Sequence, residues 1–478
     1  MSENCTDKFS GTFFCIQNIV RADGNIRLSI GEFMKLLFVS LGCDKNLVDS
    51  EEMLGLLTAN GFEIVDDETL AEVIVVNTCC FINDAKEESV NTILEMAEYK
   101  KEGTCKVLIV TGCMAQRYKN EIIEEVPEVD AVLGTTSYGD ILKAINEAMD
   151  GKHFQEFKDI DYLPEKLGKR VLTTGGHFGY LKIAEGCDKH CTYCIIPKLR
   201  GKFRSVPMER LVAQAQEMAE EGVKELILVA QETTVYGTDI YGKKSLHILL
   251  KELCKIKGIR WIRVLYCYPE EIYDELIQTM KEEKKICHYL DLPIQHASDR
   301  ILKRMGRRTT QAELVAIVNK LRQEIPDIVL RTTLITGFPG ETQEDHEELM
   351  GFVDEMEFDR LGVFTYSPEE DTPAADMPDQ IPEEVKEERR DEIMELQQEI
   401  SYDKGTDRIG QELMVMIEGK VADESAYIGR TYGDAPKVDG YIFVQTGELL
   451  MTGDFAKVRV TGALEYDLIG ELADEYTE

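Results

Sequence analysis

The sequence predicts an α/β protein in three parts: an N-terminal doubly wound parallel sheet, a central partial (β/α) barrel and a C-terminal small β-barrel. Three patterns support this prediction. Strand and helix patterns alternate over residues 34–150, as in a parallel sheet covered by helices. About six β/α units follow within residues 173–402, fewer than the eight of a closed barrel. Residues 405–471 contain short alternating runs separated by glycines, which indicate a small all-β module.

The N-terminal part begins at Met34, which is followed at once by a buried strand. Residues 1–33 show no clear periodicity, so we interpret them as an N-terminal extension and regard Met34 as an alternative start of translation. The expected strands are Leu36–Leu41, Glu72–Asn77 and Val107–Thr111, and the expected helices are Asn46–Ala59 and Asp84–Glu98. Residues 151–176 have mixed charge and little pattern, which is typical of a connection.

In the central part, apolar runs and helical patterns follow one another regularly. The expected strands are Leu181–Ala184, Leu226–Val229, Trp261–Leu265, Tyr289–Leu292, Val329–Ile335 and Leu361–Thr365. The expected helices are Glu209–Glu220, Ser245–Lys255, Glu270–Glu282, Asp299–Met305, Gln311–Glu324 and Gln343–Glu355. Functional groups are expected at the carboxyl ends of such strands. A Pro- and Glu-rich hinge and a charged helix up to about Ile400 lead to the terminal module, with expected strands Leu413–Ile417, Tyr441–Val444 and Ala456–Val460.

The chain has 13 cysteines in 478 residues, which is many for an intracellular protein, and the number is odd. Secreted disulfide-rich domains are usually short, with paired cysteines behind a signal peptide, and the first 33 residues contain no small-residue cleavage site. We therefore expect a cytoplasmic protein whose reduced cysteines bind metal or carry redox chemistry. No run of eighteen or more apolar residues occurs, so no membrane-spanning segment is expected.

Cys187, Cys191 and Cys194 form a C-x3-C-x2-C loop directly after the first strand of the central part. Iron–sulfur clusters are bound by cysteine thiolates, so this loop can hold three corners of a cubane cluster and leave one iron open. The alternative is a zinc site completed by His190 or by a distant cysteine. Closed zinc sites usually pair two C-x2-C units, and the sequence has no second unit, so we favour the cluster.

Cys43, Cys79 and Cys113 each follow a predicted strand of the N-terminal part. Adjacent parallel strands lie about 4.8 Å apart and their carboxyl ends meet at one edge, so these thiols can converge on a single metal site. A glycine directly before Cys43 and another before Cys113 allow the backbone to approach closely. The alternative is that all three are small buried hydrophobic residues. Spacing alone leaves Cys80 as a competitor of Cys79.

The remaining cysteines have no partner spacing, and we interpret them as core or incidental residues: Cys5, Cys15, Cys105, Cys254, Cys267 and Cys287.

The C-x3-C-x2-C loop, with an aromatic residue before its last cysteine, resembles the radical S-adenosylmethionine (SAM) superfamily. Together with the three strand-end cysteines and a small terminal β-domain, it is similar to the methylthiotransferase family over Met34 to Gly470. The resemblance implies SAM and two [4Fe–4S] clusters. The loop cysteines would hold the cluster that cleaves SAM, and Cys43, Cys79 and Cys113 an auxiliary cluster. It also implies that the central part is a radical SAM core and the terminal module a TRAM-like barrel for substrate recognition.

Within this family the sequence resembles the ribosomal-protein branch, which modifies the β-carbon of an aspartate in the small-subunit ribosomal protein S-twelve. The stretches that carry this resemblance are Val39–Ser50, Cys194–Pro197, Tyr289–Ser298 and Asp434–Gly440. The sister branch, which thiomethylates an adenosine of transfer RNA, has a similar domain order and is the alternative. A non-catalytic iron–sulfur or zinc-binding protein is a second alternative, but it would not need a six-unit β/α domain.

The resemblance implies SAM contacts at Tyr193, Gln231, Ile335 and Gly337. Many superfamily enzymes carry a Gly-Gly-Glu turn after the second strand, which contacts the methionine amino group, whereas this sequence has Ala230-Gln231-Glu232. We expect the backbone or Gln231 to substitute there. The stretch Ile335–Gly340 resembles the strand-end turn that packs against adenine.

The expected reaction opens a C–H bond that acid–base chemistry cannot easily open. In the expected reaction the loop cysteines would hold the cluster that passes an electron to SAM, a radical formed from SAM would take the hydrogen, and the auxiliary cluster would supply sulfur. A second SAM is the methyl donor that the resemblance implies, and a flavodoxin or ferredoxin is the expected electron donor.

Charge favours a protein substrate over RNA. The chain has a formal net charge of −36, whereas nucleic-acid binders normally carry a basic surplus. Residues 403–478 contain seven Lys or Arg against sixteen Asp or Glu, a net charge of −9. An RNA-binding barrel should instead show a basic groove with aromatic stacking partners. Because ribosomal proteins are strongly basic, an acidic module would steer protein S-twelve well.

Overall fold

The computed structural model describes residues 12–13, 34–422 and 424–473. It divides the chain into two units. The first contains the chain up to Thr173 together with Glu185–Asp188 and Ile195–Arg204, and the second contains the rest. The predicted extension over residues 1–33 lies outside the described residues except for strand β1 (Thr12–Phe13), which pairs antiparallel with β2 (Met34–Ser40).

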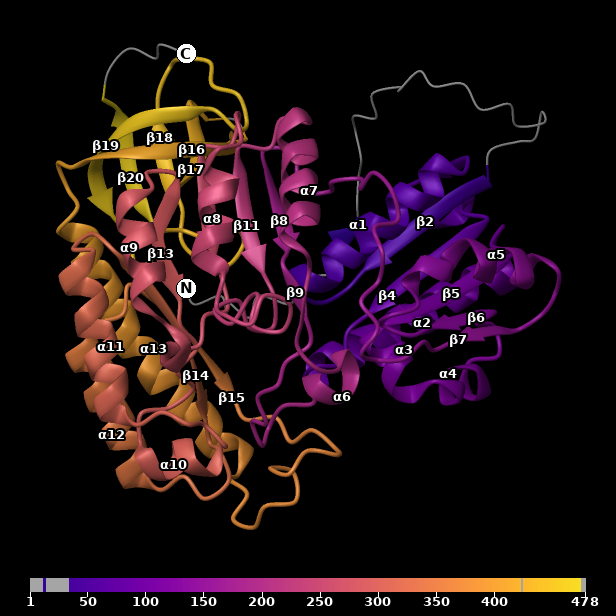
Figure 1. The fold of residues 1–478 in the computed structure, drawn as a ribbon, viewed down its shortest axis with the longest axis horizontal. Helices are drawn as coiled ribbons and strands as arrows, with labels where there is room; N and C mark the ends of the chain where they lie inside the picture. The colour runs from indigo at the N-terminus through magenta and orange to yellow at the C-terminus, as the bar shows by residue number, and fades with distance from the viewer. Residues whose placement is uncertain (1–11, 14–33, 423, 474–478) are drawn as a thin grey trace. The chain divides into compact units, whose positions relative to one another are not determined.

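The first unit is built on a sheet whose strands, apart from β1, are all parallel (Figure 1). Its order is β1-β2-β4-β5-β6-β7, with β3 also paired to β2. The chain therefore runs from β2 to β3 on one side and then crosses to β4 on the other, so the topological switch point lies between β2 and β4. The remaining strands are β3 (Phe62–Ile64), β4 (Val73–Thr78), β5 (Val107–Gly112), β6 (Ala131–Leu133) and β7 (Phe154–Glu156).

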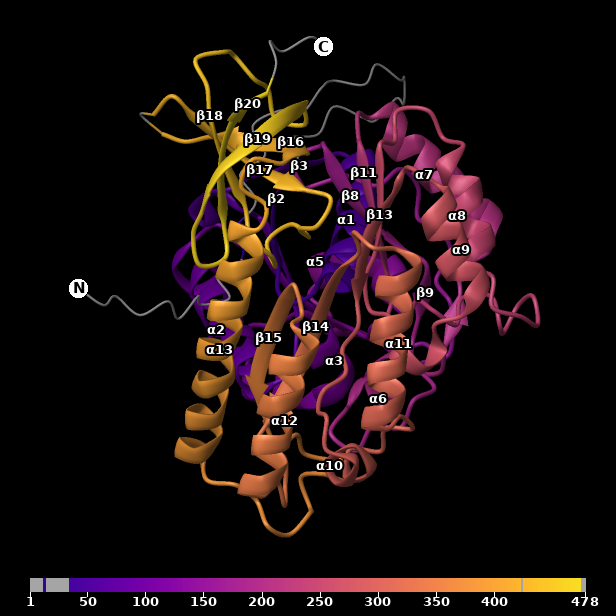
Figure 2. The same cartoon turned by 90° about the vertical axis from the view of Figure 1, so that its left-hand side faces the viewer.

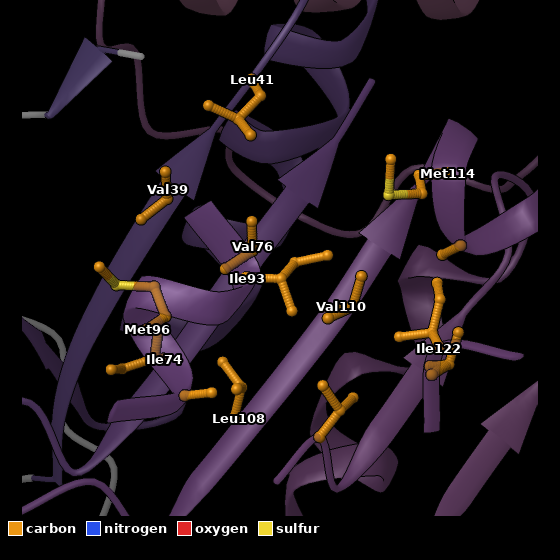
Figure 3. Packing of buried hydrophobic residues seen from close by; sticks show 14 of the residues in the cluster. Val39, Leu41, Ile74, Val76, Ile93, Met96, Leu108, Val110, Met114 and Ile122 are labelled. Atoms are coloured by element: carbon orange, nitrogen blue, oxygen red, sulfur yellow. The ribbon is translucent and has the colours of Figure 1, made fainter. Parts of the chain in front are cut away.

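Helices bury both faces of this sheet, which is why its strands are almost continuously apolar. Alternate residues of β2 face opposite sides: Leu37 and Val39 join one hydrophobic cluster, and Leu36 and Phe38 join the other. Figure 3 shows the first cluster, where strand residues meet side chains of α2. The helices are α1 (Asp44–Ala59), α2 (Asn83–Glu102), α3 (Cys113–Tyr118), α4 (Asn120–Glu125), α5 (Ile141–Met149) and α6 (Ile196–Arg200).

The doubly wound sheet is confirmed, and the three predicted strands correspond to β2, β4 and β5. The sequence pattern did not reveal β3, β6 and β7, which have three residues each. A run this short shows no measurable periodicity, and β7 falls in the stretch that we had interpreted as a connection.

The second unit begins with a six-stranded parallel sheet of order β15-β14-β13-β12-β11-β8. Sequential strands are neighbours, and β8 and β15 are not paired with each other, so the barrel is partial, as predicted. In Figure 2, α12 lies in front of β14 and β15, with α13 to their left and α11 to their right. The strands are β8 (Phe178–Lys182), β11 (Glu225–Val229), β12 (Trp261–Val264), β13 (Ile286–Asp291), β14 (Val329–Thr336) and β15 (Arg360–Thr365).

The helices of the second unit agree with the expected ones to within a few residues. Residues 270–282, expected as one helix, form a short 3-10 turn at Pro269–Glu271 followed by α9. The helices are α7 (Met208–Glu220), α8 (Leu246–Cys254), α9 (Asp274–Glu282), α10 (Asp299–Arg304), α11 (Gln311–Glu324), α12 (Gln343–Met356) and α13 (Glu383–Thr406). Within the described residues, no helix combines the length and the apolar character needed to cross a membrane.

The C-terminal module is a closed five-stranded barrel of order β16-β17-β18-β20-β19, which confirms the predicted small β-barrel. Its strands are β16 (Glu412–Lys420), β17 (Ala426–Thr431), β18 (Ile442–Gln445), β19 (Phe455–Ala463) and β20 (Leu468–Leu472). The sequence analysis missed β17 and β20, since each contains a glycine within a short run.

A buried ion-pair network joins the barrel to the sheet of the same unit. Glu225 on β11 accepts hydrogen bonds from Arg263 on β12 at 2.8 Å and from Arg430 on β17 at 2.7 Å. All three side chains are fully buried. Burial opposes ionisation of Glu225, but the two arginines hold the pKa of its carboxyl below the usual value.

A second set of contacts comes from the loop between β17 and β18. Asp434 pairs with Arg360 on β15 at 2.6 Å. Asp439 lies 3.4 Å from Arg331 on β14 and accepts a hydrogen bond from the Tyr289 hydroxyl at 2.8 Å. Arg263 on β12 also donates to the Tyr432 carbonyl at 2.6 Å, so the barrel is attached to five strands of the sheet, β11 to β15, and is not a loosely tethered module.

We expect Arg430→Met to lower the free energy of unfolding by about 3 kcal/mol or more, because it leaves the fully buried Glu225 and the half-buried Glu418 with fewer partners. Arg459→Met is the matched control, since Arg459 is a half-exposed barrel arginine paired with Glu412. Urea unfolding followed by circular dichroism measures both variants. Equal losses in the two would contradict this account of the network.

Candidate functional site

Three cysteines lie at the carboxyl edge of the first sheet, next to its switch point. Cys43 precedes α1 after β2, Cys79 directly follows β4, and Cys113 directly follows β5. Since β2, β4 and β5 are hydrogen-bonded neighbours in this order, parallel alignment places the three residues along one edge. This is the part of a doubly wound sheet where ligands bind.

The backbone around these cysteines is closely packed. Gly42 has φ +86°, and a Cβ built on it would lie 2.7 Å from Cys79 Cβ and 2.9 Å from Cys79 Sγ. Gly112 has φ +94°, and its added Cβ would lie 2.5 Å from the Thr78 carbonyl oxygen. Both positions thus require glycine for its conformation and for its lack of a side chain.

Electrostatics also place the three thiols near one another. Burial raises the pKa of the Cys79 thiol, and the neighbouring Cys113 and Cys43 raise it further. Burial raises the pKa of the Cys113 thiol as well, so a cation or a cationic cluster would stabilise the thiolates of both Cys79 and Cys113. Cys43, in contrast, is exposed.

Cys79 interacts electrostatically with both of the other cysteines. Cys80 is completely buried in the hydrophobic cluster that includes Ile93 and Met96 of α2. Ser89 of α2 holds the Cys79 backbone, because its hydroxyl accepts from the Cys79 amide at 3.1 Å and donates to the Cys79 carbonyl at 2.8 Å.

Buried amides tie the strand ends together, and the sequence analysis did not identify them as functional. Asn46 Nδ2 donates to the carbonyl of Leu41 at 2.7 Å and to that of Thr78 at 3.1 Å. Asn77 Nδ2 donates to the Asn46 carbonyl at 3.0 Å. A polar residue within an otherwise apolar strand end was the signal available in the sequence.

The C-x3-C-x2-C loop divides between the two units. Cys187 belongs to the first, where its amide donates to the Gly201 carbonyl at 3.1 Å. Gly186 before it has φ +78°, and an added Cβ would lie 2.1 Å from the Lys202 carbonyl oxygen. A glycine is therefore required at this turn as well.

Cys191, Tyr193 and Cys194 belong to the second unit. The loop between them is fixed through Thr192, whose amide donates to the Met305 carbonyl and whose carbonyl accepts from the Ala374 amide, both at 2.9 Å. Cys191 Sγ lies 3.8 Å from the Tyr268 hydroxyl.

Of the predicted SAM contacts, Tyr193 and Ile335 are brought together. Both pack against a buried cluster that contains Phe338, and the Tyr193 and Phe338 rings meet edge to face at 6.4 Å. Gly337, with φ +68°, is packed against α13, where an added Cβ would lie 2.1 Å from Lys386 Cγ. Gln231 is half-buried just beyond the carboxyl end of β11 and is not a member of this cluster.

Glu232, beside Gln231, is the more unusual residue of that turn. Its side chain is buried, and one oxygen accepts from the Thr234 amide at 2.9 Å. The other oxygen is buried without a hydrogen-bond partner among the described residues. Burial raises the pKa of this carboxyl to about 7, which marks a group that a cationic ligand would stabilise in its charged form.

Within the described residues, no group of three or more His, Cys, Asp or Glu side chains is arranged to hold a single metal ion. A cubane cluster makes a different demand, because each of its irons takes its own thiolate. Three cysteines spread along the edge of a sheet can each bind a different iron, so their arrangement and their thiolate chemistry fit an iron–sulfur cluster.

Comparison with known proteins agrees with this geometry. Three family profiles match in succession: the uncharacterized protein family UPF0004 over residues 35–134, the radical SAM superfamily over residues 181–353, and the TRAM domain over residues 409–473. The ribosomal protein uS12 methylthiotransferase RimO of Lachnoclostridium phytofermentans is 66% identical over 437 residues, covering 91% of this chain and 99% of that protein. The chain belongs to the ribosomal protein uS12 methylthiotransferase family.

Other members of this family are less similar but align over the same extent. The RimO protein of Clostridioides difficile strain 630 is 49% identical over 92% of this chain and 99% of its own length. Among solved structures, the radical SAM methyltransferase TsrM of Kitasatospora setae, with cobalamin and a [4Fe-4S] cluster bound, superposes with a TM-score of 0.53. It shares 13% identity over 72% of this chain and 74% of that chain, so this similarity concerns the fold alone.

We expect Gly42→Ala to destabilise the protein more than Gly151→Ala does. Both glycines have positive φ, but an added Cβ meets Cys79 at position 42 and nothing within 4 Å at position 151. The control should cost only the backbone strain of about 1–2 kcal/mol. Denaturant unfolding of the iron-free protein measures the difference. Equal losses of unfolding free energy in the two variants would contradict the close approach of Gly42 to Cys79.

Proposed function

We propose that this enzyme transfers a methylthio group to the β-carbon of an aspartate in ribosomal protein uS12 by radical SAM chemistry. The observation that carries the proposal is the alignment of Cys43, Cys79 and Cys113 at the switch point of the first sheet. A second cysteine site fits sulfur transfer, because that reaction needs a sulfur source beside the SAM-cleaving cluster. Membership of the uS12 methylthiotransferase family supports the same reaction.

Six cysteines would hold two [4Fe–4S] clusters: Cys187, Cys191 and Cys194 the SAM-cleaving one, and Cys43, Cys79 and Cys113 the auxiliary one. When bound, these groups and SAM supply the one-electron chemistry and the sulfur that a C–H bond without an acidic proton requires. The protein would contribute three thiolates to each site and closely packed glycine turns beside them.

Glu232 and Tyr193 are the residues that we assign to SAM itself. The unpartnered Glu232 oxygen at the end of β11 would accept from the methionine amino group. Tyr193, Ile335 and Phe338 pack together in one apolar cluster, which we assign to the wall of the SAM site. Glu232 replaces Gln231 as the side chain we expect at that turn, because it is the buried charge in need of a partner.

The acidic barrel favours a protein substrate. A basic protein such as uS12 would be attracted by the acidic surplus of residues 403–478, whereas transfer RNA would be repelled. The other partner that we propose is a small electron carrier, a flavodoxin or ferredoxin, since the reaction consumes electrons one at a time. Both partners imply that the enzyme works in the cytoplasm.

The test is anaerobic incubation of the reconstituted enzyme with SAM, a reductant and either uS12 or transfer RNA, followed by mass spectrometry. We expect a methylthio group on one aspartate of uS12 and none on the RNA. Cys79→Ser should lose the iron of one cluster and all methylthiolation while still releasing deoxyadenosine. Cys80→Ser, its matched neighbour, should keep both clusters. Methylthiolated RNA, or an iron loss confined to Cys80→Ser, would refute the assignment.

We expect Glu232→Gln to weaken SAM binding about tenfold or more, because a hydrogen bond to a charged group contributes ~1.5–3 kcal/mol. Gln231→Ala, the neighbouring substitution, should change it much less. Equilibrium binding of SAM to the reconstituted protein measures both. A larger loss of SAM affinity in Gln231→Ala than in Glu232→Gln would instead assign the SAM contact to Gln231.

A further inference from the structure

Arg307 follows helix α10 in a turn that packs directly against the cysteine loop of the second unit. Gly306, the residue before it, has φ +74°, and a Cβ built there would lie 2.9 Å from the His190 carbonyl oxygen. The Thr192 hydroxyl donates to the Arg304 carbonyl at 2.8 Å. All of these residues belong to the same unit, so the position of Arg307 is fixed relative to the loop.

The Arg307 side chain is buried and has hydrogen-bond donors in reserve. It is 1% exposed. Nη2 donates to the Pro293 carbonyl at 3.0 Å, whereas Nε and Nη1 are buried and have no acceptor among the described residues. Glu270 Oε2 lies 3.7 Å from Nη2, which is too far for a hydrogen bond. Because unpaired donors of a buried cation are costly, we expect them to meet an acceptor that the chain itself does not provide.

The guanidinium lies close to the loop cysteines. Its central carbon lies 4.3 Å from the centre of the Tyr268 ring. Tyr268 follows strand β12, and its hydroxyl lies 3.8 Å from Cys191 Sγ. One aromatic ring therefore separates the cation from a cysteine of the loop. This places Arg307 at the carboxyl edge of the partial barrel, where reacting groups are expected.

Arg307 also belongs to a set of ion-paired side chains whose charges do not cancel. Glu270 lies 3.7 Å from Arg307 and 3.9 Å from Lys189. Glu271 pairs with Lys189 and, at 2.8 Å, with Lys244. Three cations thus face two carboxylates within this set. The surplus positive charge suits one further anion.

We propose that Arg307 binds a carboxylate of the reacting molecules through the donors that the chain leaves unpaired. A carboxylate accepts such charge-assisted hydrogen bonds and supplies the missing negative charge. This inference rests on the proposed function, in which two carboxylates come to this edge. One belongs to the target aspartate, whose β-carbon reacts, and the other to the methionine part of SAM. Glu232, which we assign to the methionine amino group, carries the wrong sign for either.

The test compares ligands with and without each carboxylate. Equilibrium binding to the reconstituted enzyme is measured for uS12 and for uS12 with asparagine in place of the target aspartate, and likewise for SAM and decarboxylated SAM. We expect the wild-type enzyme to favour the carboxylate in one of these pairs about tenfold or more. Arg307→Gln should abolish that preference, and the pair in which it does so identifies the source of the carboxylate.

Arg360→Gln is the matched control, since Arg360 is a largely buried arginine of the same unit, the first residue of β15, paired with Asp434 at 2.6 Å. It should leave the preference intact, and Arg307→Lys, which keeps the charge, should retain part of it. Glu270→Gln/Arg307→Gln removes the carboxylate that would lose its cation, so the test does not depend on one variant that folds.

A wild-type enzyme that favours neither carboxylate would overturn the inference without any variant. A preference that survives in both Arg307→Gln enzymes, or that Arg360→Gln removes equally, would overturn it as well. Absence of methylthiolated uS12 with the wild-type enzyme would instead refute the proposed function, which is a different failure.

Discussion

The structure depends on one constraint, which is that neighbouring strands of the first sheet run parallel. Parallel alignment brings the carboxyl ends of β2, β4 and β5 to a single edge. Residues that are 36 and 34 positions apart in the chain, Cys43, Cys79 and Cys113, thereby become neighbours. An antiparallel sheet with the same sequence would send alternate cysteines to opposite ends. The crossover from β3 to β4 also opens the switch point at this edge, where a ligand can bind.

Burying the ends of these strands carries a free-energy cost, which hydrogen bonds from other residues offset. A sheet buried on both faces ends in carbonyl groups that must find donors away from water. Asn46 provides such donors to the carbonyls of Leu41 and Thr78, and Asn77 holds Asn46 by donating to its carbonyl. Stability and function therefore use the same side chains here, and the glycines at 42 and 112 make the close approach sterically feasible.

The sequence was sufficient for features with a long regular pattern and insufficient for features that arise from tertiary contacts. The six β/α units could be predicted because each repeats a strand of four to eight residues and a helix. The strand-end cysteines could be predicted because topology alone aligns them. In contrast, Arg200 reaches Asn46 and Asp49 only because α6 packs into the first unit, and no spacing rule links residues so far apart. The unpartnered oxygen of Glu232 is likewise visible only when its neighbours are known.

The charge argument for the substrate also changes once contacts are known. Three acidic residues of the terminal segment, Glu418, Asp434 and Asp439, form ion pairs with buried arginines, so they are not available to a partner. One basic residue of the segment, Arg430, is likewise paired in the buried network and cannot contact a partner. Without these paired residues, residues 403–478 still contain six basic against thirteen acidic side chains, so the net charge stays negative and keeps most of its magnitude. The acidity of the barrel is therefore not an artefact of its attachment to the core, and electrostatic attraction of a basic protein remains its physical consequence.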